Sequence, residues 1–408
     1  MAVNLLPPVA ADLKPIEGVR LATASAGIKK PGRQDLVLIE IAEGSHTAAV
    51  YTRNAFCAAP VVLCREHQQQ ASPRYLLINS GNANAGTGDL GMQAAKRSCQ
   101  AVASLTHVSA QSVLPFSTGV IGQQLPVEKI ETVLPSAVAD LQADNWFAAA
   151  NAIMTTDTIA KAQSVECQLG GQTVTLTGIA KGAGMIRPDM ATMLSYIATD
   201  AAISETVLNS FLKQSMDQSF NRITVDGDTS TNDACVLIAT GKAGNAEIGS
   251  LESDDAKSFM MALNKLSRFL AEAIVRDGEG ATKFIAINVH GGADAGECRQ
   301  VAYTIAHSPL VKTALFASDP NWGRILAAVG RSGLDNLDLS KIDIALDDVA
   351  IVTGGQPDVD YTETKGQQVM DQSEITIHIT LGRGQAEDLV WTCDFSYDYV
   401  KINAEYRT

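Results

Sequence analysis

The chain has 408 residues, of which 46% are hydrophobic and 19% are charged, and its net charge is −14. These values are typical of a globular protein with a sizeable core, and the length allows two domains or one large layered domain. An acidic chain lacks the basic surface that nucleic acids and anionic membranes require. No apolar run approaches the roughly 18 residues of a membrane span and no signal peptide is visible, so a cytoplasmic location is expected.

The spacing of the residues does not match a metal-binding or nucleotide-binding motif. Seven cysteines and six histidines are dispersed, without a CxxC or HExxH pattern, which favours reduced thiols and no metal site. No strand leads into a GxGxxG or Walker loop. Residues 226–237 begin like a calcium loop, but Thr231 and Leu237 stand where glycine and glutamate are needed. We expect a polar turn there, and leave open whether it lines a site.

Strand and helix patterns alternate along the chain without a regular βαβ rhythm, which favours a layered α/β or α+β architecture. Strands are expected at 36–41, 47–51, 75–78, 174–179, 234–239, 283–289, 325–329, 342–346, 375–379 and 389–395. Helices are expected at 92–105, 127–140 with a break near Pro135, 146–154, 206–218 with Ser204 as N-cap, and 254–275. A domain boundary is expected near 278–282, where the last of these helices ends.

The segment 181–194 is the most unusual stretch of the chain. Two glycines and Pro188 shape a turn that leads into a buried element. Thr192 lies at the start of that element. A threonine hydroxyl becomes a nucleophile when the residue is a chain terminus, because its own α-amine then acts as the base. This chemistry requires cleavage of the Ala191–Thr192 bond by attack of the hydroxyl on the preceding carbonyl. On residue types alone, a glycine turn with an incidental threonine is the alternative.

Acyl chemistry at Thr192 would need donors aimed at an oxyanion. Thr118 and Gly119, on a loop expected after a strand, can offer a hydroxyl and a backbone N–H, although a plain turn is the alternative. Glu279 lies between two glycines in 276–283 and is suited to face an amine, whereas a solvated connection is the alternative. Residues 319–324 form a turn with Trp322, which anchors two layers or contributes to a site.

Several of these motifs together resemble one family, the glutamate N-acetyltransferase/ornithine acetyltransferase family of arginine biosynthesis. The resemblance covers essentially the whole chain, and the motifs occur in the family's order. They are found at 27–30, 52–54, 58–61, 79–85, 117–122, 154–158, 276–283 and 319–324. This agreement favours the nucleophile over the incidental threonine at position 192.

The resemblance implies self-cleavage into an α chain of 1–191 and a β chain of 192–408. It implies transfer of the acetyl group of N2-acetyl-L-ornithine to L-glutamate through an acetyl-Thr192 ester, without a cofactor. Acetyl-CoA as a second donor is left open. The residue roles carried over are Thr118 and Gly119 as the oxyanion hole, and as substrate contacts Thr156, Lys181, Thr192, Glu279, Asn403 and Thr408. From their charges, Lys181 is expected to bind a carboxylate and Glu279 an ammonium group.

The implied fold is a four-layer αββα sandwich, expected at 1–280, with a smaller C-terminal α+β domain at 281–408. The family also implies assembly of two α and two β chains. The chain departs from the family pattern at Ala183 and Asp189, where serine and asparagine are expected. Both lie in the cleavage segment, where Asp189 adds a negative charge near the expected scissile bond, and their effect on the cleavage rate is left open.

Two other functions remain open. An N-terminal-threonine amidohydrolase or aminopeptidase of related fold would use the same nucleophile but pass the acyl group to water. An uncleaved metabolite-binding or scaffold protein would form no acyl-enzyme at all.

Overall fold

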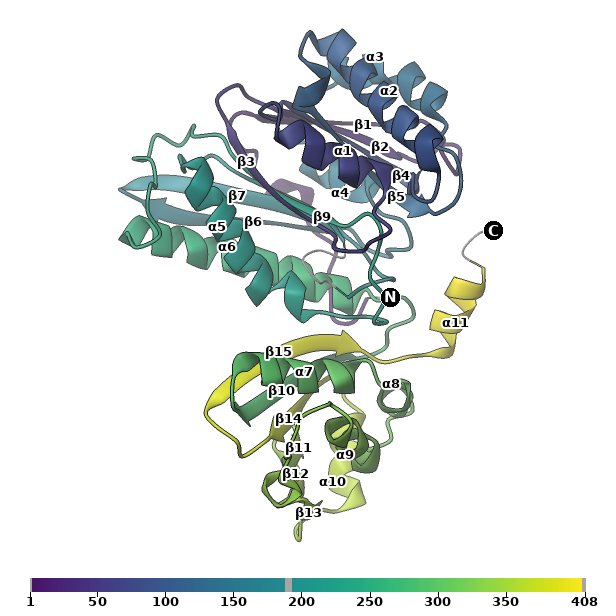
Figure 1. Ribbon diagram of the computed structural model, residues 1–408, viewed down its shortest axis with the longest axis vertical. Coiled ribbons are helices and arrows are strands. Elements are labelled where there is room, and N and C mark those ends of the chain that lie inside the picture. Colours follow the sequence, from purple (N-terminus) through teal and green to yellow (C-terminus); the bar gives the residue numbers. More distant parts are fainter. Residues whose placement is uncertain (1, 188–192, 406–408) are drawn as a thin grey trace. The chain divides into compact units, whose positions relative to one another are not determined.

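The structure is a computed structural model that describes residues 2–187 and 193–405 (Figure 1). It divides into two compact units. The larger comprises Pro7–Asn221 and Asp228–Ile274, and the smaller comprises Met1–Leu6, Arg222–Gly227 and Val275–Thr408. The smaller unit therefore draws on three separate parts of the chain. The domain limits expected from the sequence, 1–280 and 281–408, stay a prediction.

Two β-sheets form the centre of the larger unit. The first has the strand order β1-β2-β4-β5, and the second has the order β3-β9-β8-β7-β6. The strands of the first sheet are β1 (Val19–Ala24), β2 (Leu36–Ile41), β4 (Tyr75–Asn82) and β5 (Val113–Val120). Those of the second are β3 (His46–Tyr51), β6 (Lys161–Leu169), β7 (Gln172–Lys181), β8 (Leu194–Thr199) and β9 (Ala234–Ala239).

Helices cover the outer faces of these sheets (Figure 1). Those of the first sheet are α1 (Ala59–Gln68), α2 (Gly88–Thr106) and α3 (Val127–Ala139), with α4 (Trp146–Ala152) packed against strands of both sheets. Those of the second are α5 (Glu205–Gln218) and α6 (Asp254–Arg276). The unit is thus the αββα sandwich expected from the sequence. Helix α3 runs through Pro135 without the expected break.

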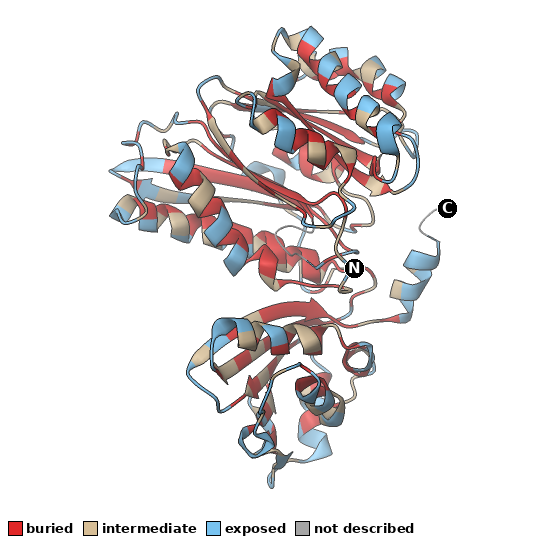
Figure 2. Ribbon diagram, in the orientation of Figure 1, coloured by how far each residue is buried: buried red, intermediate tan, exposed pale blue. Residues whose placement is uncertain are grey.

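Two hydrophobic clusters join three of these layers, the two sheets and the helices over the first sheet. Ile39 and Ile78 of the first sheet pack with Tyr196 and Val236 of the second, and all four side chains are buried. A separate cluster joins the other face of the first sheet to α2 and α3. Strands β8 and β9 are buried at every position, in keeping with their nearly continuous apolar sequences (Figure 2).

The smaller unit contains a six-stranded mixed sheet with the order β13-β12-β11-β14-β10-β15. Its strands are β10 (Phe284–Gly292), β11 (Asp343–Leu346), β12 (Val349–Thr353), β13 (Gln356–Pro357), β14 (Glu374–Thr380) and β15 (Ala386–Cys393). Its helices are α7 (Ala295–Ala306), α8 (Pro309–Phe316), α9 (Trp322–Gly330), α10 (Glu363–Met370) and α11 (Tyr397–Ala404). Within residues 2–187 and 193–405, short 3-10 helices occur at Ala10–Asp12, Ala110–Ser112, Phe220–Arg222 and Leu339–Lys341.

Residues 325–329 were expected to form a strand, and this prediction is wrong. They lie in α9, where the side chain of Asn321 caps the helix by accepting a hydrogen bond of 3.2 Å from the N–H of Arg324. Ile325, Ala328 and Val329 are buried at the three- and four-residue spacing of a helix face. Across the described ranges, every helix is too short or too polar to span a lipid bilayer.

Candidate active site

The ends of three neighbouring strands meet where the expected nucleophile segment enters the second sheet. Lys181, the last residue of β7, pairs with Leu194 of β8, and Leu194 pairs with Ala234 of β9. The N–H of Ala234 donates a hydrogen bond of 2.9 Å to the carbonyl of Met193. Thr192 itself, and the Ala191–Thr192 bond, lie outside the described residues. The described chain resumes at Met193, directly after it.

Thr118 and Gly119 lie at the carboxyl end of β5, within the strand rather than on a loop beyond it. They pair with Ser80 and Gly81 of the parallel strand β4. Gly119 has a φ of +134°, and a Cβ atom there would lie 2.3 Å from the carbonyl carbon of Gly81. Only glycine fits this position, which leaves the backbone bare at the end of the strand.

Asn232 ties the start of β9 to this pair. Its side-chain amide donates hydrogen bonds of 2.9 Å to the carbonyl of Ser117 and 2.6 Å to the carbonyl of Ala83. The turn 226–233, which the sequence predicts as polar, therefore joins the carboxyl end of β5 to the three strand ends of the second sheet. The expected oxyanion hole and the segment after Thr192 are brought to one part of the larger unit.

A buried group of charges surrounds Lys181. Lys161 donates to Asp157 at 2.7 Å, and both side chains are fully buried. Burial alone would raise the pKa of Asp157, but the positive charges of Lys161 and Lys181, with hydrogen bonds from Lys161 and Thr155, hold it below its usual value. The carboxylate of Asp157 also accepts a hydrogen bond of 2.7 Å from the N–H of Gly182. It thereby holds the loop containing Thr156 beside Lys181.

Asp233 is a second buried carboxyl group near Lys181, and only 3% of its surface is exposed. Burial raises its pKa well above the usual value, against the lowering effects of the Ser230 hydroxyl and the Lys181 charge. The sequence pattern did not single out Asp233, Asp157 or Lys161. The acidic turn that ends at Asp233 was the available signal, because a polar turn leading into a wholly buried strand places its last side chain in the core.

Glu279 and Asn403 of the smaller unit are in contact with each other. The Asn403 amide donates a hydrogen bond of 2.8 Å to a Glu279 carboxylate oxygen, and Glu279 is buried. Gly280 makes room for the start of α11, since a Cβ atom there would lie 2.5 Å from the N–H nitrogen of Tyr399. The Ser396 hydroxyl donates to the Gly280 carbonyl at 2.6 Å. Thr408 lies outside the described residues.

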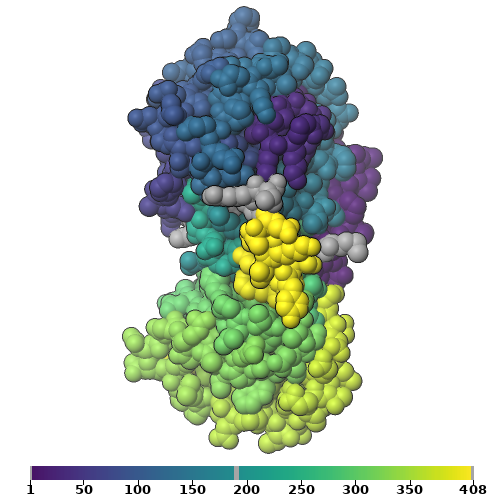
Figure 3. Space-filling view, turned by 90° about the vertical axis from the view of Figure 1, so that its right-hand side faces the viewer, coloured from purple at the N-terminus to yellow at the C-terminus, as the bar shows by residue number. Residues whose placement is uncertain are grey.

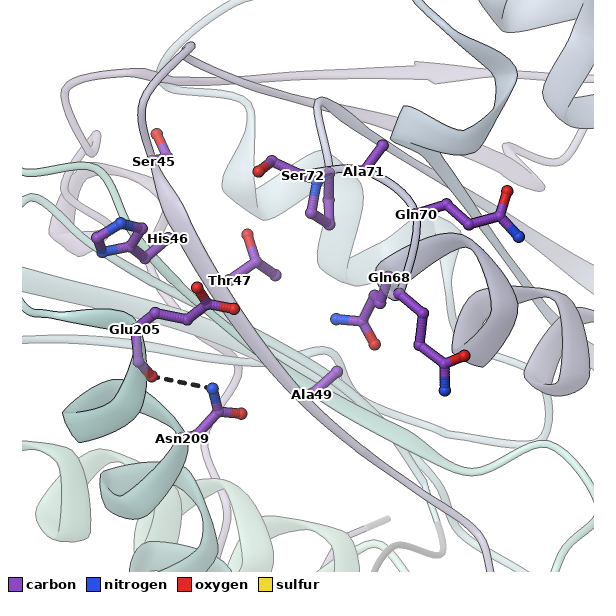
Figure 4. Close-up of a pocket in the computed structure, with 12 residues that line it drawn as sticks. Ser45, His46, Thr47, Ala49, Gln68, Gln70, Ala71, Ser72, Glu205 and Asn209 are labelled. Carbon is purple, nitrogen blue, oxygen red and sulfur yellow. Dashed lines mark hydrogen bonds between the residues drawn. The ribbon is translucent and has the colours of Figure 1, made fainter.

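A polar pocket of about 430 Å³ lies elsewhere in the larger unit (Figure 4). It is lined by the amino-terminal part of β3, including His46, by the end of α1 with Gln68, and by Glu205 and Asn209 of α5. His46 pairs with Ala239, the last residue of β9, whereas Asp233 precedes the first. None of the expected site residues that the structure describes lines this pocket. Among the described side chains, no group of three or more His, Cys, Asp or Glu is placed to hold a metal ion.

Comparison with known proteins identifies the family. The ArgJ family model matches residues 20–408. The chain is 57% identical over its whole length to the whole of the arginine biosynthesis bifunctional protein ArgJ of Pseudomonas fluorescens strain Pf0-1. It is 58% identical to the protein of the same name from Methylococcus capsulatus, over 97% of each chain.

A solved structure of the ArgJ protein of Bacillus halodurans is 41% identical to this chain, with a TM-score of 0.50. The match covers 52% of this chain and 99% of the solved one. The family match over residues 20–408 and the identity of these relatives agree with the resemblance found in the sequence motifs. The chain therefore belongs to the ArgJ family.

Proposed function

We propose that this protein is an enzyme of arginine biosynthesis that transfers the acetyl group of N2-acetyl-L-ornithine to L-glutamate through an acetyl-Thr192 ester. Its membership of the ArgJ family over residues 20–408 is the observation that carries the proposal. The positions of Thr118 and Gly119 at the end of β5, linked by Asn232 to the strand that follows Thr192, support it.

The first step is self-cleavage. The Thr192 hydroxyl attacks the carbonyl of Ala191, the amide becomes an ester, and water hydrolyses that ester. The products are an α chain ending in the carboxylate of Ala191 and a β chain whose Thr192 carries a free α-amine. The α-amine then serves as the base for the hydroxyl of the same residue.

In the acetyl transfer, the Thr192 oxygen attacks the acetyl carbonyl of the donor while its α-amine takes the hydroxyl proton. The Thr118 hydroxyl and the Gly119 N–H hold the oxyanion. The ornithine amine leaves with the proton from the α-ammonium. The α-amine of glutamate next attacks the ester, and N-acetylglutamate leaves as the proton returns to the Thr192 oxygen.

Substrate contacts follow from charge. Lys181 is suited to bind a substrate carboxylate, beside the loop that holds Thr156. The buried carboxylate of Glu279, oriented by Asn403, is suited to receive a substrate ammonium group. We assign Thr408 to the same substrate contacts from the family pattern. The bifunctional name of the relatives extends the proposal to acetyl-CoA as a second acetyl donor, and we further propose an assembly of two α and two β chains in the cytoplasm.

Intact mass measurement tests the proposal. Purified wild-type protein should give two chains that together account for the 43.1 kDa precursor, the second beginning at Thr192, while Thr192→Ala stays whole. Incubation with acetylornithine should add one acetyl group to the β chain, and glutamate should remove it as N-acetylglutamate. Release as acetate without glutamate would instead indicate an amidohydrolase. An uncut wild-type chain would contradict both enzymes.

A further inference from the structure

The sequence of the loop that carries Glu279 does not by itself fix the direction of the Glu279 side chain. Glycines flank this residue on both sides, and Gly280 has a φ of +70°. The N–H of Ala281 donates a hydrogen bond of 2.9 Å to the carbonyl of Gly278, so Glu279 lies in a tight turn. Because glycine restricts its neighbours little, contacts from outside the turn must orient the carboxylate. Asn403 provides one of them, but its neutral amide does not compensate the negative charge.

Asp394 holds the end of this loop, where the loop leads into β10. Asp394 follows β15 directly and is fully buried. Its Oδ1 atom accepts hydrogen bonds of 2.8 Å from the N–H of Thr282 and 2.9 Å from the N–H of Lys283. Its Oδ2 atom accepts one of 2.5 Å from the Thr282 hydroxyl. A buried carboxylate that accepts three hydrogen bonds is well satisfied, and it ties the Glu279 loop to the end of β15.

Ser396 attaches the same segment to the middle of the loop. Its hydroxyl donates a hydrogen bond of 2.6 Å to the carbonyl of Gly280 and accepts one of 3.2 Å from the N–H of Asp398, in the first turn of α11. Together with the contacts of Asp394 and Asn403, these bonds show that residues 394–403 run along the Glu279 loop in the opposite direction. A shift at residue 394 would therefore move both the loop and the start of the helix that carries Asn403.

Helix α8 fixes the residues on each side of Asp394. Lys312 of this helix is buried, and its Nζ atom donates a hydrogen bond of 2.9 Å to the Thr392 hydroxyl and another to the carbonyl of Cys393. The N–H of Phe395 donates a hydrogen bond of 3.2 Å to the carbonyl of Lys312. Asp394 is thus held in the core of the smaller unit, and its hydrogen bonds give the loop a fixed position.

We propose that Asp394 is a positioning residue that holds Glu279 in place to bind the side-chain ammonium group of N2-acetylornithine. This inference rests on the proposed function. A carboxylate favours a ligand that carries an ammonium group only when other residues keep its oxygens in the binding geometry. Asp394 therefore determines how strongly the enzyme prefers donors with such a group. Its role depends on hydrogen bonding, and asparagine can fulfil it: the amide oxygen accepts from the two N–H groups, and the amide nitrogen donates to the Thr282 hydroxyl.

The test compares two acetyl donors, N2-acetylornithine and N2-acetylnorvaline, which has the same carbon chain without the terminal amine. Wild type should show a higher kcat/KM for acetylornithine. Asp394→Ala should raise the KM for acetylornithine about tenfold and change kcat less than about twofold, because the lost contact binds the ground state and the transition state alike. The kcat/KM for acetylnorvaline should stay at the wild-type value, and Asp394→Asn should keep the wild-type preference.

Asp388→Ala is the matched control. It also removes a buried carboxylate from the same chain segment, but Asp388 pairs with Arg299 at 2.8 Å and lies six residues earlier, roughly 20 Å away along an extended chain. It should keep the wild-type preference even if it lowers stability. Ser396→Ala is a milder second variant, which should lower the preference in the same direction if Asp394→Ala does not fold.

Three results would overturn the assignment: equal losses with both donors in Asp394→Ala and Ser396→Ala, an equal loss of preference in Asp388→Ala, or a wild type that transfers acetyl groups without preferring acetylornithine. The proposed function is judged separately in the same assay, by acetyl transfer from acetylornithine to glutamate in the wild type. That transfer can stand while the role of Asp394 fails.

Discussion

At the scale of single residues, the larger unit contains positions where the surrounding atoms tolerate only one kind of side chain. Gly119 combines a left-handed φ with contact against the β4 backbone. Asp157 and Lys161 form an ion pair with no exposed side-chain surface. Glycine at position 119 leaves the backbone uncovered at the expected oxyanion hole. The Asp157–Lys161 ion pair holds the loop that contains Thr156 in place. Both features support the site indirectly, through shape and charge.

Gly119→Ala is expected to destabilise the fold by about 2 kcal/mol or more, because the new Cβ atom meets the Gly81 backbone in a strained conformation. Gly122→Ala is the matched control. Gly122 also has a positive φ, of +82°, but no atom lies within 4 Å of a Cβ built there. Its loss should be about 1 kcal/mol. Urea unfolding measures both, and equal losses would show that the contact with Gly81 is unimportant.

Lys161→Met is expected to destabilise the protein by about 3 kcal/mol at pH 7, because it leaves the buried Asp157 with one cation fewer. The folded-state pKa of Asp157 is lowered, so the pair stabilises the fold above the unfolded pKa of about 3.9 and loses this contribution as the pH falls toward the folded-state pKa. The difference in the free energy of unfolding between wild type and Lys161→Met should therefore become smaller below about pH 4.

Lys14→Met provides the comparison for that experiment. Lys14 pairs with Glu166 at 2.5 Å, but the two side chains are 49% and 41% exposed. Its replacement should cost about 0–1 kcal/mol at either pH. Urea unfolding measures both variants. If Lys161→Met and Lys14→Met lose a similar free energy of unfolding, burial does not make the Lys161 ion pair more important for stability.

At the scale of elements, α11 differs from the other helices of the smaller unit. Its described residues include none that is buried, and Tyr397 and Val400 are 84% and 67% exposed. Its side chains stand at the molecular surface in the space-filling view, where it is coloured yellow (Figure 3). It is held by local contacts, such as the stacking of Tyr399 on Phe395 with ring centroids 4.5 Å apart. A helix with so little burial contributes little to stability, which is compatible with a role in binding.

Deletion of residues 397–408 should change the free energy of unfolding by about 1 kcal/mol at most, since surface groups contribute little. Acetyl transfer should be lost, because Glu279 loses Asn403 and the proposed Thr408 contact disappears. Asn403→Ala keeps α11 but removes the hydrogen bonds of the Asn403 amide to Glu279 and to the Tyr399 carbonyl, and it should raise the KM for acetylornithine. Full activity in the truncated enzyme would exclude α11 from the site.

Helices and strands whose apolar residues recur at a regular spacing could be predicted from the sequence. Short helices that depend on a capping side chain at their start could not. Residues 234–239 and 254–275 were recognised because their apolar patterns match a buried strand and a one-sided helix. The apolar sequence of residues 325–329 predicts a strand, because five mostly apolar residues are too few to display the periodicity of a helix. The side chain of Asn321, which caps the first turn, stabilises the helix instead. Helices α1, α7, α8, α10 and α11 were not predicted, since their apolar faces are short.

Some residues of the candidate site could likewise be predicted from the sequence, and others could not. Motif order identified Thr118, Gly119, Lys181, Glu279 and Asn403, of which Glu279 and Asn403 are in contact and Gly119 has a backbone that excludes a side chain. Asp157, Lys161 and Asp233 were not recognised. Their importance comes from burial and from pairing between segments that are separate in sequence, and a pattern of residue types does not carry that information.

At the scale of the whole molecule, the second sheet combines strands from both sides of the expected cleavage point. Strands β3, β6 and β7 precede residue 192, whereas β8 and β9 follow it. In the order β3-β9-β8-β7-β6, the later strands lie between the earlier ones. Six residue pairs join β7 to β8, and six join β3 to β9. The two proposed chains thus share one hydrogen-bonded sheet and one hydrophobic core.

The cleaved chains are therefore expected to stay together under native conditions. Gel filtration of the mature protein should give one peak that contains both chains, even after dilution to nanomolar concentration. Separation should require a denaturant that also melts the secondary structure, as measured by circular dichroism. Chains that separate before the secondary structure melts would show that the shared sheet does not hold them.

The interleaved strand order also has a kinetic consequence. The precursor folds as one chain, so the refolding rate of Thr192→Ala should not depend on protein concentration. Once the peptide bond is cut, β8 and β9 must find their places between strands of another molecule, and refolding of the denatured mature protein becomes a bimolecular reaction. Its half-time should lengthen as the protein is diluted. Self-cleavage would then convert an equilibrium fold into one that is preserved chiefly by the slowness of its unfolding.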